Sequence, residues 1–188
     1  MMGGPMRRGG RRSAGNRLGD VARQRLMEAH QRYQDGQYAE AAERFGRMAE
    51  VARERNMPQI AAHLSAKAAA SHAQLGDAGQ MRSWLDRAVS DARQVTDKDR
   101  TARTFGTLVQ VLRGSPLAGS ADEIEAELRQ QLGVTPKASE GGGTVNRSMR
   151  RQLPQRCSAC GAPVSGAEVQ FNEDGSADCN FCGSILTG

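Results

Sequence analysis

The four cysteines of this 188-residue chain are the residues whose types and spacing could do chemistry. They form two C-x2-C pairs, Cys157 with Cys160 and Cys179 with Cys182, and the stretch 161–178 separates the pairs. The short spacing inside each pair lets both sulfurs reach one ion, and the glycine after each pair permits a tight turn. This pattern is typical of a tetrahedral zinc site, so we predict one structural zinc ion bound by all four thiolates.

Two other uses of these thiols stay open, an iron centre of the rubredoxin type and a thiol redox pair. Phe171 and Phe181 are the aromatic residues nearest to the cysteines in the sequence, which is a thin aromatic shell for an iron centre. Four thiolates leave no open position on a metal for a water nucleophile, and this disfavours catalytic zinc. In a reducing compartment, cysteines confined to the end of the chain indicate metal binding rather than disulfides.

The stretch between the two pairs predicts a β-hairpin. Residues 168–172 alternate in polarity, Glu173-Asp174-Gly175 supplies a turn, and residues 176–178 form a return strand. Two cysteine knuckles joined by a hairpin resemble a zinc ribbon, and the resemblance covers residues 157–188. Zinc ribbons often touch nucleic acid, but this segment carries four carboxylates and no Lys or Arg, so it would repel phosphate. We expect it to pack on protein instead, either on the helical part of this chain or on a basic partner.

Between residues 21 and 132, apolar residues recur at spacings of three and four, which is typical of amphipathic helices. The pattern predicts six amphipathic helices, the third opening at Pro58. Helix-breaking glycines fall at nearly equal intervals, at Gly36, Gly76 and Gly114. One pair of helices per interval is typical of a helical repeat, with an unrelated helical bundle as the alternative.

Capping residues give the starts of three of these helices. Asp77 is a good N-cap for the fourth helix, and Thr96 or Asp97 for the fifth. Ser120 and Glu123 have the spacing of a capping box at the start of the sixth helix. Each of these signals predicts a boundary that a structure can test.

Residues of the first helix pair carry a family resemblance. Tyr33, Gly36, Tyr38, Ala41 and Phe45 resemble the G-x-Y-x-x-A-x-x-x-F centre of a tetratricopeptide repeat. The resemblance implies a solenoid of about three helix pairs, mainly α, followed by the small β zinc ribbon. It also implies a scaffold that binds a protein partner in a concave groove lined by the first helix of each pair.

The candidate partner-binding residues in that groove are Arg23, His30, Tyr33 and His63. Tyrosine and arginine are common anchors in binding surfaces. Small side chains make up much of the remaining lining, so we expect a weakly charged groove without a clamp for a peptide carboxylate. The competing interpretation is that the tyrosine and the histidines are packing residues.

Basic charge gathers at two segments, although the net charge is only +5. Residues 1–16, rich in Gly and Arg, predict a disordered basic arm, and residues 134–156 predict a flexible basic linker. Between them, residues 17–133 form the helical repeat domain, and residues 157–188 form the zinc ribbon. The glycine-rich linker predicts that these two folded units are thermodynamically separate.

Neither an enzyme nor a membrane protein is indicated. The chain lacks a nucleophile and base pair, an H-E-x-x-H helix, a phosphate loop and a G-x-S-x-G elbow. Its apolar runs are too short to span a bilayer, and its arginine-rich start is not followed by the apolar region of an export signal. We therefore expect a cytoplasmic protein, and the strong preference for Arg over Lys fits a bacterial, GC-rich genome.

The function class predicted is a non-enzymatic protein-interaction adaptor or scaffold with one structural zinc ion. The alternative is a nucleic-acid-associated factor that binds non-specifically through residues 1–16 and 147–156. For these two segments, a solvated tail is the simpler interpretation. Partner binding through the helical groove remains the first expectation.

Overall fold

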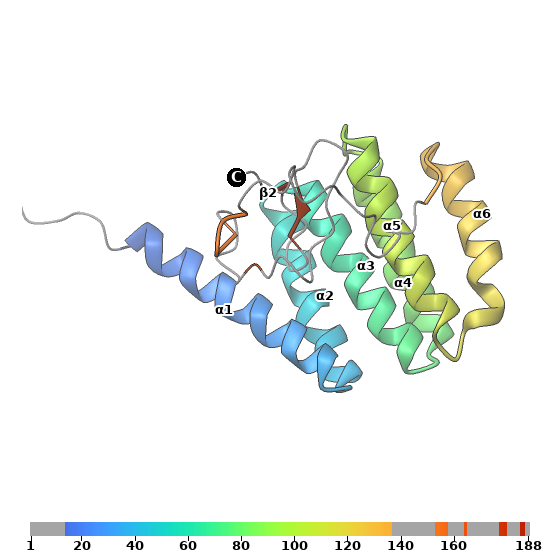
Figure 1. Ribbon diagram of the computed structural model, residues 1–188, viewed down its shortest axis with the longest axis horizontal. Helices are drawn as coiled ribbons and strands as arrows, with labels where there is room; N and C mark the ends of the chain where they lie inside the picture. The colour runs from blue at the N-terminus through green and yellow to red at the C-terminus, as the bar shows by residue number, and fades with distance from the viewer. Residues whose placement is uncertain (1–13, 137–152, 158–163, 165–176, 180–184, 187–188) are drawn as a thin grey trace, which may run out of the picture.

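A computed structural model describes residues 14–136, 153–157, 164, 177–179 and 185–186. It is mainly helical, as the periodicity predicts (Figure 1). The elements are α1 (Ala14–Gln34), α2 (Tyr38–Glu54), α3 (Pro58–Gln74), α4 (Ala78–Ala92), α5 (Lys98–Arg113), the 3-10 turn η1 (Ala118–Ser120), α6 (Ala121–Leu132), β1 (Ala177–Asp178) and β2 (Ile185–Leu186). No helix in the described part of the chain has both the length and the apolarity needed to cross a membrane.

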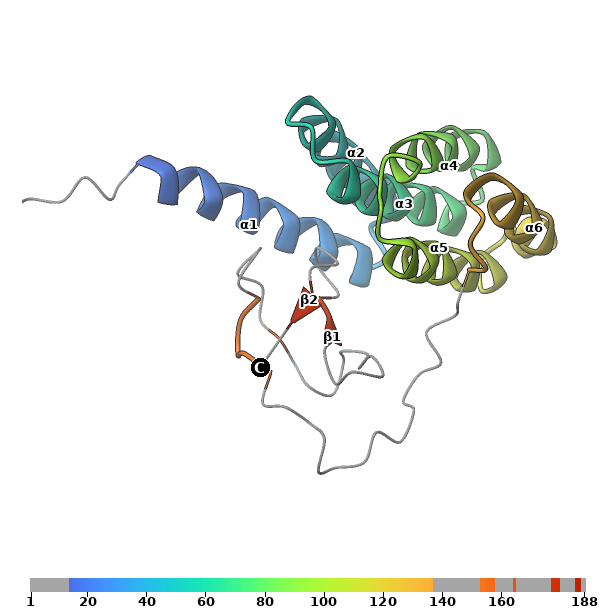
Figure 2. The same ribbon diagram turned by 90° about the horizontal axis from the view of Figure 1, so that it is seen from above.

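The six helices form an array consistent with a helical repeat. α1 packs on α2 and α2 on α3, α3 contacts both α4 and α5, and α6 contacts both α4 and α5. The interval between the starts of α2 and α4, at Tyr38 and Ala78, equals the interval between the starts of α3 and α5, at Pro58 and Lys98. The first helix of each pair lies nearer to the C-terminal strands than the second (Figure 2).

Several helix boundaries confirm the sequence signals. Pro58 occupies the first turn of α3. Asp77 caps α4 by accepting a hydrogen bond from the Gln80 N–H (3.0 Å), and Asp97 caps α5 by accepting one from the Arg100 N–H (3.0 Å). Each carboxylate satisfies a backbone donor that lacks a partner in the first turn of its helix.

The predicted capping box of α6 is wrong. Ser120 has helical backbone angles and makes no side-chain cap, and its hydroxyl donates instead to the Leu117 carbonyl (2.8 Å). The reason is that η1 runs directly into α6, so the chain does not turn at Ser120 as an N-cap requires. The helical unit also extends further than predicted at both ends, because α1 begins at Ala14 and Val134 is buried in the helical core.

The three helix-breaking glycines differ in backbone conformation. Gly36 and Gly76 follow α1 and α3 with φ of 76° and 71°, in the left-handed region where a side chain is strained. Gly114 follows α5 with φ of −93°, which any residue can adopt. The third glycine therefore ends its helix at the expected place without the conformation that makes the first two necessary.

One hydrophobic core, which we call the helical core, is built from α3 to α6. Phe105 and Leu112 are fully buried at its centre. α3 contributes small side chains on several faces, so its neighbours can approach its backbone closely. The buried residues of α3 are Ala61, Ala62, Leu64, Ser65, Ala66, Ala68, Ala69, Ala70, Ser71 and Ala73.

The second core, which we call the shared core, joins α1, α2 and α3 to the end of the chain. Its helical members are Leu26, Ala29, Ala41, Phe45, Ala49, Leu64 and Ala68. Its other buried members, which we call the C-terminal contact residues, are Cys157, Ala177, Cys179 and Leu186. Apolar residues beyond the predicted linker therefore pack on α1 to α3, one of the two places where the sequence analysis expects the C-terminal segment to pack.

Polar and aromatic contacts tie α2 to α4. The Arg53 guanidinium donates two hydrogen bonds to the buried Asp91 carboxylate, from Nε to Oδ1 (2.9 Å) and from Nη2 to Oδ2 (2.7 Å). Trp84 packs against both cores and lies directly over Gly46, where an added Cβ would come within 2.6 Å of the ring. The two cores therefore meet at the contact between α2 and α4.

Candidate functional site

A backbone hydrogen bond links residues on either side of the first cysteine pair. The Val164 N–H donates a hydrogen bond to the Gln155 carbonyl (3.0 Å), so the chain returns on itself between these two residues. Cys157 is buried and forms no disulfide. Val164 packs against the shared core. This closure presents Cys157 beside α1 to α3.

Residues on either side of the second cysteine pair are also paired through the backbone. β1 and β2 pair antiparallel with Ala177 opposite Leu186, and these strands flank the second cysteine pair in the sequence. The paired residues stand two before and four after the cysteine pair in both cases, so the same positions are linked around each pair. The return strand expected at residues 176–178 is present at Ala177–Asp178, and its described partner is β2, while residues 168–172 lie outside the described residues.

The buried thiols suit a soft metal ion. Cys157 and Cys179 each expose 2% of their surface, belong to the same apolar cluster and form no disulfide. Thiolate is the ligand that zinc prefers at a closed structural site. Cys160 and Cys182 lie outside the described residues, and within those residues no three metal-ligating side chains gather. The four-ligand set thus stays a prediction, with which the positions of Cys157 and Cys179 are compatible.

The four predicted partner-binding residues lie on α1 and α3. Arg23, His30 and Tyr33 are partly buried on α1, and His63 is partly buried on α3. The His30 ring packs edge-on against Phe45, with ring centroids 5.0 Å apart. His30 and Tyr33 therefore border the shared core, to which the C-terminal contact residues also belong.

Tyr33 behaves as a packing residue in part. Its ring packs against the shared core and lies edge-on to Tyr38, with ring centroids 5.2 Å apart. Burial and the neighbouring Tyr38 raise the pKa of Tyr33, while a hydrogen bond with the Gln74 side chain opposes that rise. The phenol therefore stays neutral near pH 7 and joins α1 to α3.

Lys67 is a candidate that the groove prediction missed. It lies on α3 one turn after His63, partly buried beside the shared-core residues Leu64 and Ala68. Burial lowers the pKa of the Lys67 ammonium, and the nearby Cys179 sulfur opposes that shift. The sequence offers one signal that Lys67 is unusual. It is a lysine inside an alanine-rich helix that is buried on several faces, and such a cation needs an anionic neighbour.

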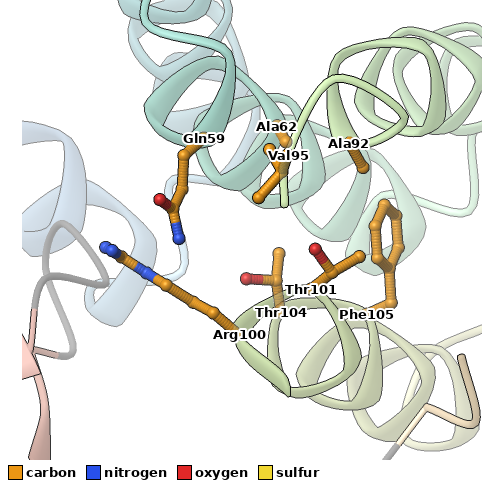
Figure 3. A pocket seen from close by; sticks show the side chains of 8 residues that line it. All are labelled: Gln59, Ala62, Ala92, Val95, Arg100, Thr101, Thr104 and Phe105. Atoms are coloured by element: carbon orange, nitrogen blue, oxygen red, sulfur yellow. The ribbon is translucent and has the colours of Figure 1, made fainter. Parts of the chain in front are cut away.

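Arg100 adds a second missed cation at the contact of α3 with α5. Once the Gln59 side-chain amide is turned so that its oxygen faces Arg100, it accepts hydrogen bonds from Arg100 Nη1 (3.0 Å) and Nε (2.8 Å). Figure 3 shows these two side chains beside a small cavity between the helices. Its volume of about 10 Å³ suits one water molecule and no substrate.

We call Arg23, His63, Lys67 and Arg100 the basic face, since they come from α1, α3 and α5. The mapping from the glycine positions included Arg23 and His63 and passed over Lys67 and Arg100. The weakly charged groove stays an expectation. No protein-family model, curated protein or solved structure matches the chain, so a function must be argued from this geometry.

Proposed function

We propose that this chain is a non-enzymatic protein-interaction adaptor, a tetratricopeptide-like solenoid of helix pairs with a C-terminal zinc ribbon that holds one structural zinc ion. The observation that carries the metal assignment is the backbone pairing at the same positions on either side of each cysteine pair. The constant interval between equivalent helices and the basic face on α1, α3 and α5 support the scaffold assignment.

The physical role of zinc in this proposal is structural. The segment from Cys157 onward has too few apolar side chains to build a core alone. Metal binding would supply the missing free energy of folding, because the four thiolates converge only in the folded state. The proposed ligands are Cys157, Cys160, Cys179 and Cys182.

Elemental analysis of the full chain, purified under reducing conditions, tests the metal assignment. We expect about one zinc per chain, and its loss in the variant Cys160→Ser+Cys182→Ser. Exposed Ser83→Ala on α4 serves as the matched control and should keep the metal. Iron with a visible charge-transfer band, or no metal in freshly reduced protein, would contradict the proposal.

The nucleic-acid alternative is tested on the same protein. Fluorescence anisotropy with a labelled single-stranded DNA oligonucleotide should show no appreciable binding at physiological salt if the chain is a protein adaptor. Binding that weakens steeply as salt rises, and that disappears on deletion of residues 1–16, would support the alternative instead. Those residues lie almost wholly outside the described part of the chain.

A further inference from the structure

Cys179, a predicted zinc ligand, is packed in the same core as the middle of α3. It directly follows β1, and Ala177 of β1 is fully buried in the shared core. Leu64 and Ala68 of α3 belong to that core as well, and the C-terminal strands lie beside the first three helices (Figure 2). A side chain of α3 can therefore act on the sulfur of Cys179.

Lys67 is the charged residue of α3 at this place. It follows Leu64 by three positions and directly precedes Ala68, so it lies on the side of α3 that borders the shared core. Its side chain is partly buried, and its ammonium lies near the Cys179 sulfur. The fold thus brings a cation of the helical array to a cysteine from the opposite end of the chain.

The neighbouring carboxylates are held by arginine. α3 itself contains no Asp or Glu. Arg53 of α2 pairs with Glu50 of its own helix (2.6 Å) and with the buried Asp91 of α4 (2.7 Å). An ammonium withdrawn from water is costly unless an anion lies nearby. The negative group that the structure places near Lys67 is the Cys179 sulfur, which offsets this cost as a thiolate and not as a neutral thiol.

We propose that Lys67 is the counter-charge of the zinc–thiolate centre, the positive group that balances the negative charge on Cys179, and that it strengthens metal retention and lowers the reactivity of this thiolate. The inference rests on the zinc assignment made above and deepens it, because it names a residue of the helical array that regulates the same site. Lys67 is not a ligand in this proposal. It acts on the metal through Cys179 and is a positioning residue.

The charge of the metal centre gives Lys67 its effect. Four thiolates bring more negative charge than one Zn²⁺ neutralises, so the centre stays anionic. A cation beside one sulfur stabilises the thiolate over the protonated thiol, so protons compete less well with the metal for that sulfur. A stabilised thiolate is also a weaker nucleophile, because nucleophilicity falls as the affinity for a proton falls. Removing the Lys67 charge should therefore weaken zinc binding and make Cys179 more reactive.

Zinc affinity of the full chain, measured by competition with a chromophoric chelator, tests metal retention. We expect Lys67→Met to bind zinc about tenfold more weakly than the wild type, as when a group that supports a metal ligand is lost. Lys67→Arg keeps the charge and should keep most of the affinity. Lys98→Met, on the exposed start of α5, is the matched control and should bind zinc like the wild type. Wild-type affinity in Lys67→Met, or an equal loss in Lys67→Arg, would overturn the inference.

Alkylation by iodoacetamide in excess zinc, followed by site-resolved mass spectrometry, separates charge from packing. Cys157 is the internal comparison, because it is as deeply buried as Cys179 in the same core and Lys67 lies near Cys179. We expect Cys179 to react about tenfold faster in Lys67→Met than in the wild type, and Cys157 to react at its wild-type rate. A loosened core would expose both cysteines. Equal acceleration at the two sites, or acceleration at neither, would therefore overturn the inference.

Elemental analysis of the same samples distinguishes this inference from the proposed function. A wild-type chain without zinc would refute the proposed function, and the counter-charge role of Lys67 with it. A zinc-loaded wild type whose affinity and Cys179 reactivity are unchanged by Lys67→Met would overturn the counter-charge role alone and leave the zinc assignment standing.

Discussion

The two cores of the helical array differ in which part of the chain supplies their remaining buried residues. The helical core takes its buried side chains from α3 to α6 and from Val134, which closely follows α6. The shared core begins with α1 and α2 and is completed by Cys157, Ala177, Cys179 and Leu186. One end of the array is therefore closed by its own helices, and the other end is covered by residues from the opposite end of the sequence.

This difference indicates where stability would depend on the proposed zinc ion. A core made of successive helices keeps its contacts whatever happens at the end of the chain. The shared core loses part of its apolar cover if the C-terminal contact residues leave, and the exposed area weakens α1 most, since α1 has neighbours on fewer sides. Four measurements would break or sharpen this comparison.

The largest expected effect comes from removing an aromatic side chain at each centre. Phe105→Ala in the helical core should lower the free energy of unfolding by about 3–5 kcal/mol, both with zinc and after chelation, because the ring is fully buried among helices. Phe45→Ala in the shared core should cost a similar amount with zinc and clearly less after chelation. Urea denaturation followed by circular dichroism measures both, and identical chelator dependence would erase the distinction between the cores.

The next effect concerns the ion pair that joins α2 to α4. Asp91→Asn removes the charge that faces Arg53, and Asp91 is only 2% exposed, so we expect a loss of about 2–3 kcal/mol. The exposed pair Arg113 and Asp122 (3.0 Å) provides the control, since Asp122→Asn should change stability by less than about 1 kcal/mol. Thermal melts of both variants measure these losses. Equal shifts in melting temperature would show that burial does not strengthen the pair of Arg53 with Asp91.

A smaller effect is expected where the two cores meet. Gly46→Ala places a methyl group within 2.6 Å of Trp84 Cζ2, so the ring must move at a cost of about 1–2 kcal/mol despite the better helix propensity of alanine. Gly79→Ala on α4 has ordinary contacts and should stabilise slightly. Because Trp84 is the only tryptophan, its fluorescence reports the displacement directly. An unshifted emission spectrum would mean that α2 and α4 move apart and that the Trp84 ring stays in place.

The smallest effect is a pH dependence at the end of α3. Burial lowers the pKa of His72 below its ordinary 6.5, and the nearby Asp77 carboxylate opposes the shift. The unfolded chain therefore takes up the proton first, so stability is full above about pH 6.5 and falls as the pH drops below it. Equilibrium unfolding between pH 7.5 and 5.5 should show a shallower decline in His72→Gln. His63→Gln, on the basic face, is the comparison.

Much of the helical array was predictable because its determinants are local. Six periodic stretches, Pro58 and the caps Asp77 and Asp97 fix helix positions from neighbouring parts of the sequence. Ser120 failed as a cap because the 3-10 turn before α6 depends on Leu117 and Ser115, whose own contacts decide the turn. Local signals fail where a turn competes with them.

The contact between the ends of the chain was not predictable in the same way. Nothing near Leu26 in the sequence indicates that Leu186 will join the same core, because apolar packing is non-directional and leaves no spacing pattern between distant residues. The cysteine spacing did indicate two related loops. Only the paired backbone showed that Ala177 faces Leu186. Lys67 could have been noticed as a cation among alanines, but its neighbour Cys179 could not.

The central position of α3 has a consequence for the order of folding. α3 is rich in alanine and small polar residues, and it contacts α2, α4 and α5, all of which are close to it in sequence. Such short-range contacts close small loops and favour fast folding. We expect the transition state to contain the hairpins on either side of α3, with φ-values near 0.5 or above for Ala68→Gly and Ala69→Gly. α1, whose remaining cover arrives from the opposite end of the chain, should then join after the rate-limiting step.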